Sequence, residues 1–413
     1  MKKIKFTIIL FLLVFSAIQS FAQFTLSGEF RPRTEYKHGY KSLAKDEMKA
    51  NIATNQRTRL NLDYKTAAYQ VFISFQDVRL WGSVAQLKPQ FGPSTYLHQA
   101  WARVNFNSAF GLKAGRQEII YDDHRIFGSV GWAPQARSHD AAILQYRANG
   151  LKADLGIAYN AYATAKGNYK AFQYLWMHKS FGNFNASFLA LNNGKEYQNS
   201  KAENILKYSQ TIGTRLGYKA GKLSAFLNLY YQGGVAGIVN DKDVKLNANL
   251  IGLDLGYKVS KALSLGLGFE QQSGNNMNIT NDEQNAFTPF YGTNHKFNGH
   301  MDYFYVGNHV GSVGLRDLFF KLGYKKNKFG FGAHAHYFTA ANKMAGDLDG
   351  ALGTELDLSL SYPLAKGVGF KMGYSQMFGT DSMVALKGGD KGATSNWAWM
   401  MIVIKPKFFT TAK

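Results

Sequence analysis

The sequence contains no cysteine among its 413 residues, and only 18% of them are charged. Without cysteine, the chain cannot form a disulfide, a thiolate zinc site or a cysteine nucleophile. Aromatic residues make up 15% of the chain, which is too many for a disordered protein. The charged fraction is low for a soluble protein of this length. Length alone would allow two or three domains, whereas the pattern described below predicts one.

Motifs for common enzyme chemistry are also missing. The sequence has no His-Glu-x-x-His helix, no Gly-Lys-Thr phosphate loop and no Gly-x-Ser-x-Gly elbow. His334 and His336 lie two residues apart, but no third ligand matches them, so we interpret them as solvated lumen histidines. Asp122 and Asp123 fall in a loop without the geometry of glycosidic catalysis. We therefore predict no catalytic residue, no metal and no cofactor.

The first 22 residues have the pattern of a secretory signal peptide. A lysine-rich start is followed by a short apolar run over 6–18 and by small residues that end at Ala22. Removing residues 1–22 takes three lysines and no acids, which changes the net charge from +21 to 21 − 3 = +18. No long apolar stretch follows, so we predict no membrane-spanning helix in the mature chain. Residues 23–413 are predicted to form a single domain.

The mature sequence alternates apolar and polar residues, which is the period-2 pattern of strands with two different faces. Residues 263–270 place apolar groups on odd positions, and 354–362 place them on even ones. Many runs end in Tyr, Phe or Trp, as the aromatic girdles of membrane barrels do. About eighteen segments have roughly the nine to eleven residues that a tilted strand needs to cross a bilayer. They are 24–34, 56–65, 68–78, 96–106, 110–118, 139–148, 150–160, 171–180, 183–192, 208–219, 222–232, 247–258, 262–272, 315–325, 328–338, 353–363, 368–378 and 396–405.

Short turns and long polar loops alternate between these segments. Short turns on one side and long loops on the other are the layout of an outer-membrane barrel, and an even strand number places both termini on the short-turn side. The short turns include 66–67 and 220–221, and the long loops are 37–55, 119–138, 193–207 and 273–314.

A soluble β-sandwich would show the same alternation within a single strand. The number of strands, the loop rhythm, the signal peptide and the aromatic strand ends favour a membrane barrel, which pairs every backbone group without leaving an edge. The predicted fold class is therefore all-β, a transmembrane antiparallel β-barrel of about 18 strands (16–18) in the outer membrane. We expect short periplasmic turns and long extracellular loops.

If the apolar positions face lipid, the opposite phase names the residues that face the lumen. A barrel of this size encloses an aqueous lumen. The lining has a basic surplus on the first six strands, which would concentrate anions, and arginine binds carboxylates bidentately. The competing interpretation is that these charges only pair across neighbouring strands. The predicted basic lining is Arg31, Arg33, Arg57, Arg59, Arg103, Lys113, Arg147 and Arg215, with Lys152, Lys321, Lys371, Asp154, Asp254, Glu270, Glu355 and Asp357 also inside.

Residues 112–146 carry a more specific pattern. A strand that ends in Gly-Arg-Gln leads into a loop with Tyr, Asp, Arg, Gly, Trp and Arg, and then into a strand that starts with Asp. This segment resembles the alginate export family of outer-membrane channels. The matching positions are Gly115, Arg116, Gln117, Tyr121, Asp123, Arg125, Gly128, Trp132, Arg137 and Asp140.

The resemblance implies an eighteen-stranded barrel that conducts a polyuronate through an arginine-rich constriction, without catalysis or energy coupling. It also implies that Arg116, Arg125, Arg137 and Asp140 line or brace that constriction. A structural alternative is that Arg116 and Arg125 fold the 119–138 loop inward by pairing with Asp122, Asp123 or Asp140.

The longest loop, 273–314, has its own composition. Aromatic residues, histidines and amide side chains crowd its 287–304 segment, and sugar rings stack on and hydrogen-bond to such groups. Long loops with mixed aromatics also pack on themselves, so we favour an ordered lid that narrows the pore.

Together, these features predict a passive outer-membrane, porin-like channel for anionic saccharides, either a polyuronate or an oligosaccharide. The alternatives are a general or small-anion uptake porin, a barrel enzyme and a plugged adhesive barrel. We expect an anionic solute and outer-membrane lipid as partners, no nucleic acid, and a monomer in preference to a trimer. The sequence leaves the solute and the direction of transport open.

Overall fold

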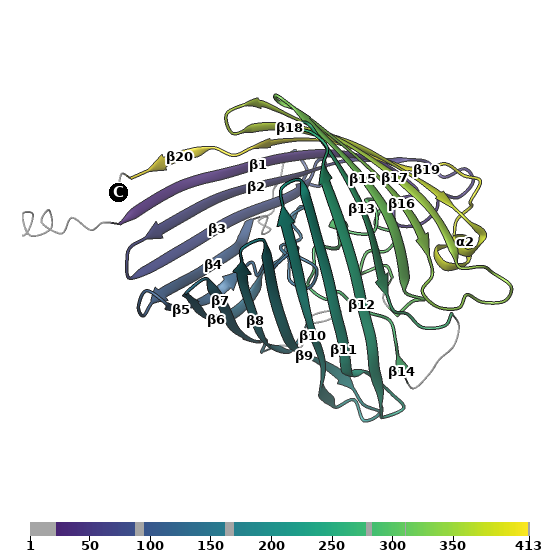
Figure 1. The fold of residues 1–413 in the computed structure, drawn as a ribbon, viewed down its shortest axis with the longest axis horizontal. Helices are drawn as coiled ribbons and strands as arrows, with labels where there is room; N and C mark the ends of the chain where they lie inside the picture. The colour runs from purple at the N-terminus through teal and green to yellow at the C-terminus, as the bar shows by residue number, and fades with distance from the viewer. Residues whose placement is uncertain (1–21, 87–94, 162–168, 278–282, 310, 412–413) are drawn as a thin grey trace, which may run out of the picture.

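The computed structural model describes residues 22–86, 95–161, 169–277, 283–309 and 311–411. They form one sheet of 20 strands, which closes because β1 pairs with both β2 and β19 (Figure 1). Eighteen strands make the antiparallel barrel wall, so the predicted fold class is confirmed. The wall strands are β1 (Gln23–His38), β2 (Asn51–Lys65), β3 (Tyr69–Leu80), β4 (Thr95–Asn105), β5 (Phe110–Gln117), β6 (His139–Ala148), β7 (Leu151–Tyr159), β8 (Ala171–Phe181), β9 (Phe184–Gln198), β10 (Asn204–Ala220), β11 (Leu223–Val239), β12 (Lys242–Lys258), β13 (Leu263–Gln272), β15 (Leu315–Lys326), β16 (Phe329–Thr339), β17 (Ala351–Ala365), β18 (Val368–Gly379) and β19 (Ser395–Ile404).

Two short strands complete the sheet. β14 (Glu283–Gln284) lies in the longest loop and pairs in parallel with β12. β20 (Lys407–Thr410) follows β19 and pairs with the first residues of β1, which places the described chain ends at the same end of the barrel. Residues 1–21 of the predicted signal peptide lie outside the described residues.

The two faces of the wall strands differ as the alternation predicts. In β12, Ile251, Leu253, Leu255 and Tyr257 are exposed on the outer surface, whereas Asp254 of the opposite phase is partly buried. Similar rows of exposed leucine, isoleucine and aromatic side chains occur on the other strands. An outward apolar band of this kind matches the hydrocarbon layer of a bilayer. Among the described residues, no helix is long and apolar enough to cross a membrane.

The wall is of unequal height. Strands β5 to β8 have 8 to 11 residues, whereas β9 to β12 have 15 to 17 and extend further at the long-loop end (Figure 1). The predicted long loop at 193–207 is therefore wrong, because strand residues occupy most of it and only 199–203 form the turn. The polar residues there resemble a loop in sequence, but above the membrane a strand is polar on both faces.

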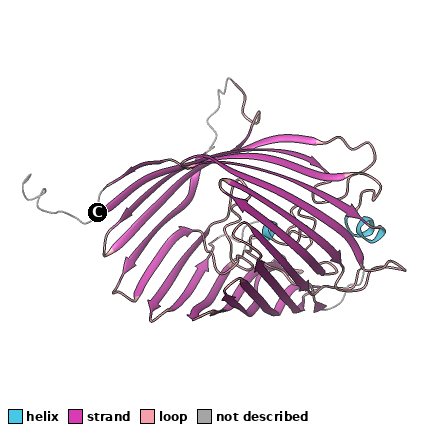
Figure 2. Ribbon diagram, turned by 45° about the horizontal axis from the view of Figure 1, so that its top comes forward, coloured by secondary structure: helices cyan, strands magenta, loops and turns pink. Residues whose placement is uncertain are grey.

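Two small helical elements also escaped prediction. α2 (Asp381–Lys387) lies between β18 and β19, and the Thr380 side chain caps it by accepting a hydrogen bond from the Met383 amide at 3.2 Å. η1 (Asn294–Lys296) is a single 3₁₀ turn in the longest loop. Figure 2 shows loop segments inside the barrel between its strand walls, and these segments build the candidate site.

Candidate functional site

Two loops fold into the barrel and meet there. The short inner loop, residues 118–138, joins β5 to β6, and the long inner loop, the described part of 273–314, joins β13 to β15. Phe127 and Tyr291 form an isolated β-bridge between them. The Gly128 amide donates to the Tyr291 carbonyl at 2.9 Å, and the Thr293 amide donates to the His124 carbonyl at 2.9 Å. The two loops therefore form one body that crosses the bore.

An aromatic core fixes this body to one side of the barrel. The rings of Phe127 and Tyr291 have centroids 5.4 Å apart, and Phe172 and Tyr174 of β8 pack against Phe127 at 5.8 and 5.0 Å. Leucines from β9 and β12 complete the cluster. Such a core is stabilised by apolar burial and by the edge-to-face preference of aromatic pairs. This core thus fills part of the lumen along β6 to β12.

Arginines of β1 hold the short inner loop from the opposite side. Arg31 donates to the carbonyls of Gly131 at 2.6 Å and Trp132 at 3.1 Å, and Arg33 donates to that of Trp132 at 2.7 Å. The Arg33 guanidinium also lies 4.1 Å from the Trp132 ring centroid. Both arginines are buried, at 8% and 4% exposed. They face the lumen as predicted, but their donors are directed to loop carbonyls.

Arginines of β2 are also engaged by protein groups. Arg57 pairs with Glu29 at 2.5 Å. Arg59 donates to the Gln76 side chain at 2.6 Å and lies 3.7 Å from Glu118. Buried ion pairs of this kind leave few donors for a passing solute. The interpretation that these charges hold the wall together therefore describes β1 and β2 well.

Arg125 joins both inner loops to the wall. Its side chain is 1% exposed, pairs with Glu270 of β13, and donates to Asn298 Oδ1 at 3.2 Å. The predicted partners of Arg125 were acids of its own loop, and this pairing is corrected. Asp123 pairs instead with Arg215 of β10 at 2.5 Å, and Asp122 accepts from the Ser187 hydroxyl at 2.5 Å.

Arg116 and Asp140 lie elsewhere than the resemblance implies. They face each other across β5 and β6, with 2.9 Å between Arg116 Nη1 and Asp140 Oδ2, and both side chains are exposed. The neighbouring His139 points to the other face and packs 5.2 Å from the Tyr291 ring. The pair therefore bridges two wall strands at the long-loop rim, and the expected bracing of the short inner loop by Arg116 is corrected.

The remaining predicted residues fall along the bore. Arg147 pairs with Asp154 at 2.5 Å, and Lys113 lies 4.0 Å from the Trp101 ring centroid. Arg103 lies across the ladder from Lys113. Arg137 donates to the Gly292 carbonyl at 3.3 Å, and burial lowers its pKa.

A group of acids and histidines on β15 to β17 was not recognised as one site from the sequence. His336 lies 2.9 Å from Asp317 and is 6% exposed, so the expectation of a solvated histidine is wrong. Glu355 accepts from the Met301 amide of the long inner loop at 2.8 Å. Asp357 accepts from the Ser375 hydroxyl at 2.5 Å. This group anchors the long inner loop, and only two strands separate β17 from β1, whose arginines anchor the short inner loop.

A buried histidine makes the long inner loop sensitive to acid. His309 Nε2 lies 3.0 Å from the Gly314 carbonyl, and burial, together with the charge of Lys387, lowers its pKa from 6.5 to about 3. Protonation is thus disfavoured only while the loop is docked. His309 contributes docking stability above pH 6.5, and this stability is lost as the pH falls from there towards 3.

We therefore expect the loop to loosen progressively below pH 6.5. Since the chain has no cysteine, a spin label on a Ser312→Cys variant reports the loop specifically, and its mobility should rise on acidification. Adding His309→Gln should flatten that response. An equally steep response without His309 would contradict this assignment.

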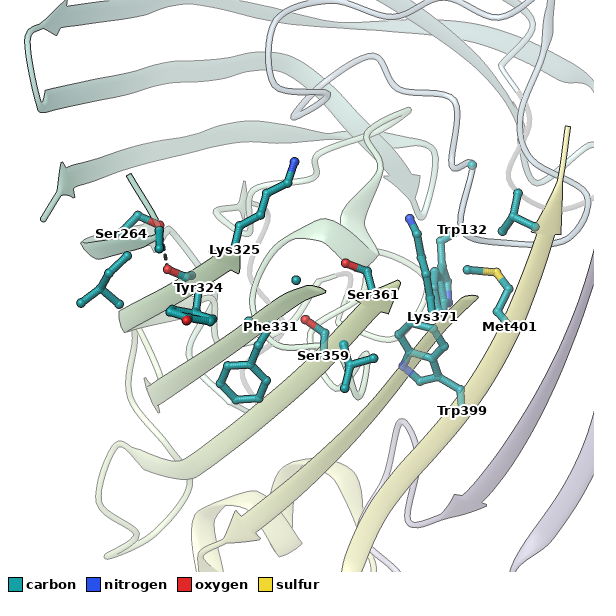
Figure 3. Close-up of a pocket in the computed structure, with 18 of the residues that line it drawn as sticks. Trp132, Ser264, Tyr324, Lys325, Phe331, Ser359, Ser361, Lys371, Trp399 and Met401 are labelled. Atoms are coloured by element: carbon teal, nitrogen blue, oxygen red, sulfur yellow. Dashed lines mark hydrogen bonds between the residues drawn. The ribbon is translucent and has the colours of Figure 1, made fainter. Parts of the chain in front are cut away.

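A cavity of about 1410 Å³ lies at the short-turn end of the bore and is called the vestibule below. Trp132 and Trp399 flank it, and Ser359 and Ser361 line its wall (Figure 3). Among the described lining residues, Glu29 is the one acid, and it is already paired with Arg57. The lining lysines are Lys222, Lys258, Lys261, Lys325, Lys371 and Lys405.

These lysines differ from the arginines above in having few partners. Within the described chain, only Lys405 has a carboxylate within 4.0 Å, namely Glu29 at 3.8 Å. In Figure 3, Lys325 and Lys371 reach into the cavity from different strands. The strand phase places Lys258, Lys325 and Lys371 on the lumen face, so continued alternation was the signal for them. Only Lys371 was assigned to the lumen from the sequence.

No family model and no curated protein matches this chain. Among solved structures, Pseudomonas aeruginosa OpdK with vanillate has a TM-score of 0.60 at 10% identity, over 94% of this chain and 99% of that one. Acinetobacter baumannii OccAB1 has a TM-score of 0.65 at 13% identity, over 94% and 97%. Pseudomonas aeruginosa OpdL has 0.62 at 12%, over 94% and 99%.

The fold is that of an outer-membrane porin. With the outward apolar band, this confirms the predicted location as a multi-pass β-barrel of the outer membrane. The resemblance to the alginate export family is not confirmed, because the similar structures are Occ and Opd porins. At 10 to 13% identity, these structures establish the fold of this chain and leave its solute to be argued from its own residues.

Proposed function

We propose that this protein is a passive outer-membrane channel for small organic anions. The observation that supports this most directly is the vestibule, whose six lysines face one acid that is already paired. A lumen lined by one sign of charge within low-dielectric walls concentrates counter-ions. Conduction also requires release, and hydrated lysine ammonium groups bind anions less rigidly than a bidentate guanidinium does.

In this proposal, the arginines and the lysines of the lumen have different roles. The arginines of β1 and β2 bind loop carbonyls and wall acids, and so set the shape of the narrow region. The vestibule lysines are the cations with few protein partners, and so set its preference for charge. Attraction of anions thus depends on lysines at the short-turn end rather than on the arginines expected from the sequence.

The class of anion follows from the space and the neighbours of these lysines. The inner loops fill much of the bore, which favours a small solute over a long polymer. Trp399 beside the lysines suits a ring that carries a carboxylate, because a ring face stacks on indole. Vanillate, which accompanies OpdK in its crystal structure, is such a molecule, and a uronate saccharide is another. The uronate remains the second candidate, because its sugar ring can also stack on Trp399.

Ion selectivity in planar bilayers tests this function. In a salt gradient, the reversal potential of the wild type should indicate a preference for anions. The Lys258→Gln/Lys325→Gln/Lys371→Gln variant should lower the anion-to-cation permeability ratio by about tenfold, the lower end of what charged clefts achieve. Block by vanillate and by a glucuronate trisaccharide, compared on the same channel, separates the two candidate solutes.

The matched control removes the same charge from the same end of the barrel. Lys326 ends β15, and Lys328 and Lys366 lie in turns. All three are exposed and do not line the vestibule, so Lys326→Gln/Lys328→Gln/Lys366→Gln should keep the wild-type permeability ratio. Cation preference of the wild type, or an equal effect of both triple variants, would contradict the proposal. Liposomes that do not swell in small anions would instead indicate a plugged barrel.

A further inference from the structure

A second cavity, of about 880 Å³, lies at the long-loop end and is called the outer cavity below. It opens where the low wall of β5 to β8 meets the high wall of β9 to β12. The long inner loop forms its floor through Phe290 and Tyr291, and Tyr169, Tyr197, Arg137 and Lys195 belong to its sides. The inner loops separate the outer cavity from the vestibule. These loops contribute residues to both cavities, but no residue lines both.

Two cations of the outer cavity have no acidic partner within the described part of the chain. Neither Arg137 nor Lys195 has a carboxylate within 4.0 Å there. The acids of this region are engaged elsewhere: Asp140 pairs with Arg116 at 2.9 Å, and Glu196 pairs with Lys170 at 2.9 Å.

The register places a second lysine beside Lys195, and that lysine already has an acidic partner. Lys207 of β10 lies directly across the ladder from Lys195 of β9, and it is paired with Asp243 at 2.8 Å. Lys195 is therefore the member of this lysine pair that faces the cavity without a counter-charge. An ammonium that faces an open cavity without a counter-charge favours binding of an anion.

Aromatic rings lie between the two cations. Phe290 and Tyr291 have centroids 5.9 Å apart and planes inclined by 30°. Lys195 Nζ lies 6.0 Å from the Phe290 centroid, and Arg137 Cζ lies 6.0 Å from that of Tyr291. Tyr169 stands 5.3 Å from Tyr291 at a steep angle. Tyr291 is 8% exposed and packs against Phe127, so the half-buried Phe290 is the ring that faces the cavity, with a cation near either ring.

We propose that the outer cavity is a binding site for a carboxylate carried on a six-membered ring, aromatic or pyranose. The ring would stack on Phe290, and its carboxylate would accept from Lys195 or Arg137. Its role as the capture site of the transport path rests on the proposed function, whereas binding itself does not. An acyclic carboxylate cannot stack on an aromatic ring of the cavity, and a neutral ring is not attracted by its cations.

Saturation-transfer NMR on the detergent-purified full chain tests this site. Benzoate and glucuronate are the two ring carboxylates, and hexanoate and benzyl alcohol supply the charge and the ring separately. We expect saturable binding of at least one ring carboxylate and weaker binding of both controls. Lys195→Gln and Arg137→Gln should each raise Kd by about tenfold, the equivalent of one charge-assisted hydrogen bond. The preferred ring identifies the natural class of solute.

Lys207→Gln is the matched control, because it removes the lysine across the ladder that does not line the cavity. It should leave Kd unchanged, as should the vestibule variant Lys258→Gln/Lys325→Gln/Lys371→Gln. Equal effects of Lys195→Gln and Lys207→Gln, hexanoate binding as tightly as benzoate, or no saturable binding would overturn the site. If ring carboxylates bind to the outer cavity but the channel shows no anion preference in planar bilayers, the proposed function is contradicted and the binding site is still supported.

Discussion

Replacing Arg125 with methionine should release both inner loops from the wall and raise the single-channel conductance. Its guanidinium contacts Glu270 of β13 and Asn298 of the long inner loop, while its backbone belongs to the short one. Losing one partner of a buried pair leaves an uncompensated charge, which costs about 3–5 kcal/mol. Conductance in planar bilayers, with protease cleavage of the loops in intact barrels, measures the release.

Two further variants show whether the conductance of Arg125→Met reflects the loss of this ion pair. Arg125→Met/Glu270→Gln removes both charges, so it should recover much of the wild-type conductance, since no buried carboxylate is left unpaired. Arg79→Gln removes an arginine whose ion pair with Asp77 is partly exposed, and this variant should have nearly the wild-type conductance. If Arg125→Met conducts like the wild type and its loops resist protease, Arg125 does not hold the loops in place.

Gly292→Ala should separate the two inner loops by a different route. A Cβ built on Gly292 lies 2.2 Å from the Arg125 carbonyl oxygen and 2.9 Å from its carbonyl carbon, and both are backbone atoms. A side chain cannot rotate away from a backbone neighbour, so the loops must move apart or the loop body must shift. The Phe127–Tyr291 bridge beside this contact should break, with a rise in conductance and in current noise.

Gly131→Ala supplies the matched control, because it adds the same methyl group to the short inner loop, where the nearest atom is the Ser129 hydroxyl oxygen at 3.4 Å. Its conductance should match that of the wild type. Identical traces from the two alanine variants would show that close approach at Gly292 is not what holds the loops together.

The wall of the barrel could be predicted from sequence because the face of a strand residue is a local property. Ile251, Leu253, Leu255 and Tyr257 alternate with polar or glycine neighbours, and each lies on the expected side. The eighteen wall strands follow from repeating this pattern. Strand ends were less predictable, since β9 and β10 continue into polar residues whose ladder partners, rather than composition, make them strands.

The roles of the lumen charges could not be predicted in this way. Strand phase places Arg31 inside, but its partner is the Gly131 carbonyl, 100 residues away, at 2.6 Å. Whether an inward arginine attracts a solute or holds a loop depends on such distant backbone atoms. The vestibule lysines at the strand ends and turns, such as Lys222 and Lys261, fall where the alternation stops. The monomeric state and the signal peptide remain predictions.

The seam of the barrel has a consequence for biogenesis. The Phe24 amide donates to the Thr411 hydroxyl at 2.9 Å, which joins positions 387 residues apart. On this side β1 pairs with β19 and β20, so its edge stays unpaired until these distant strands reach it. Long-range closure of this kind is slow, and the unfolded chain would need a chaperone to shield that edge in the meantime.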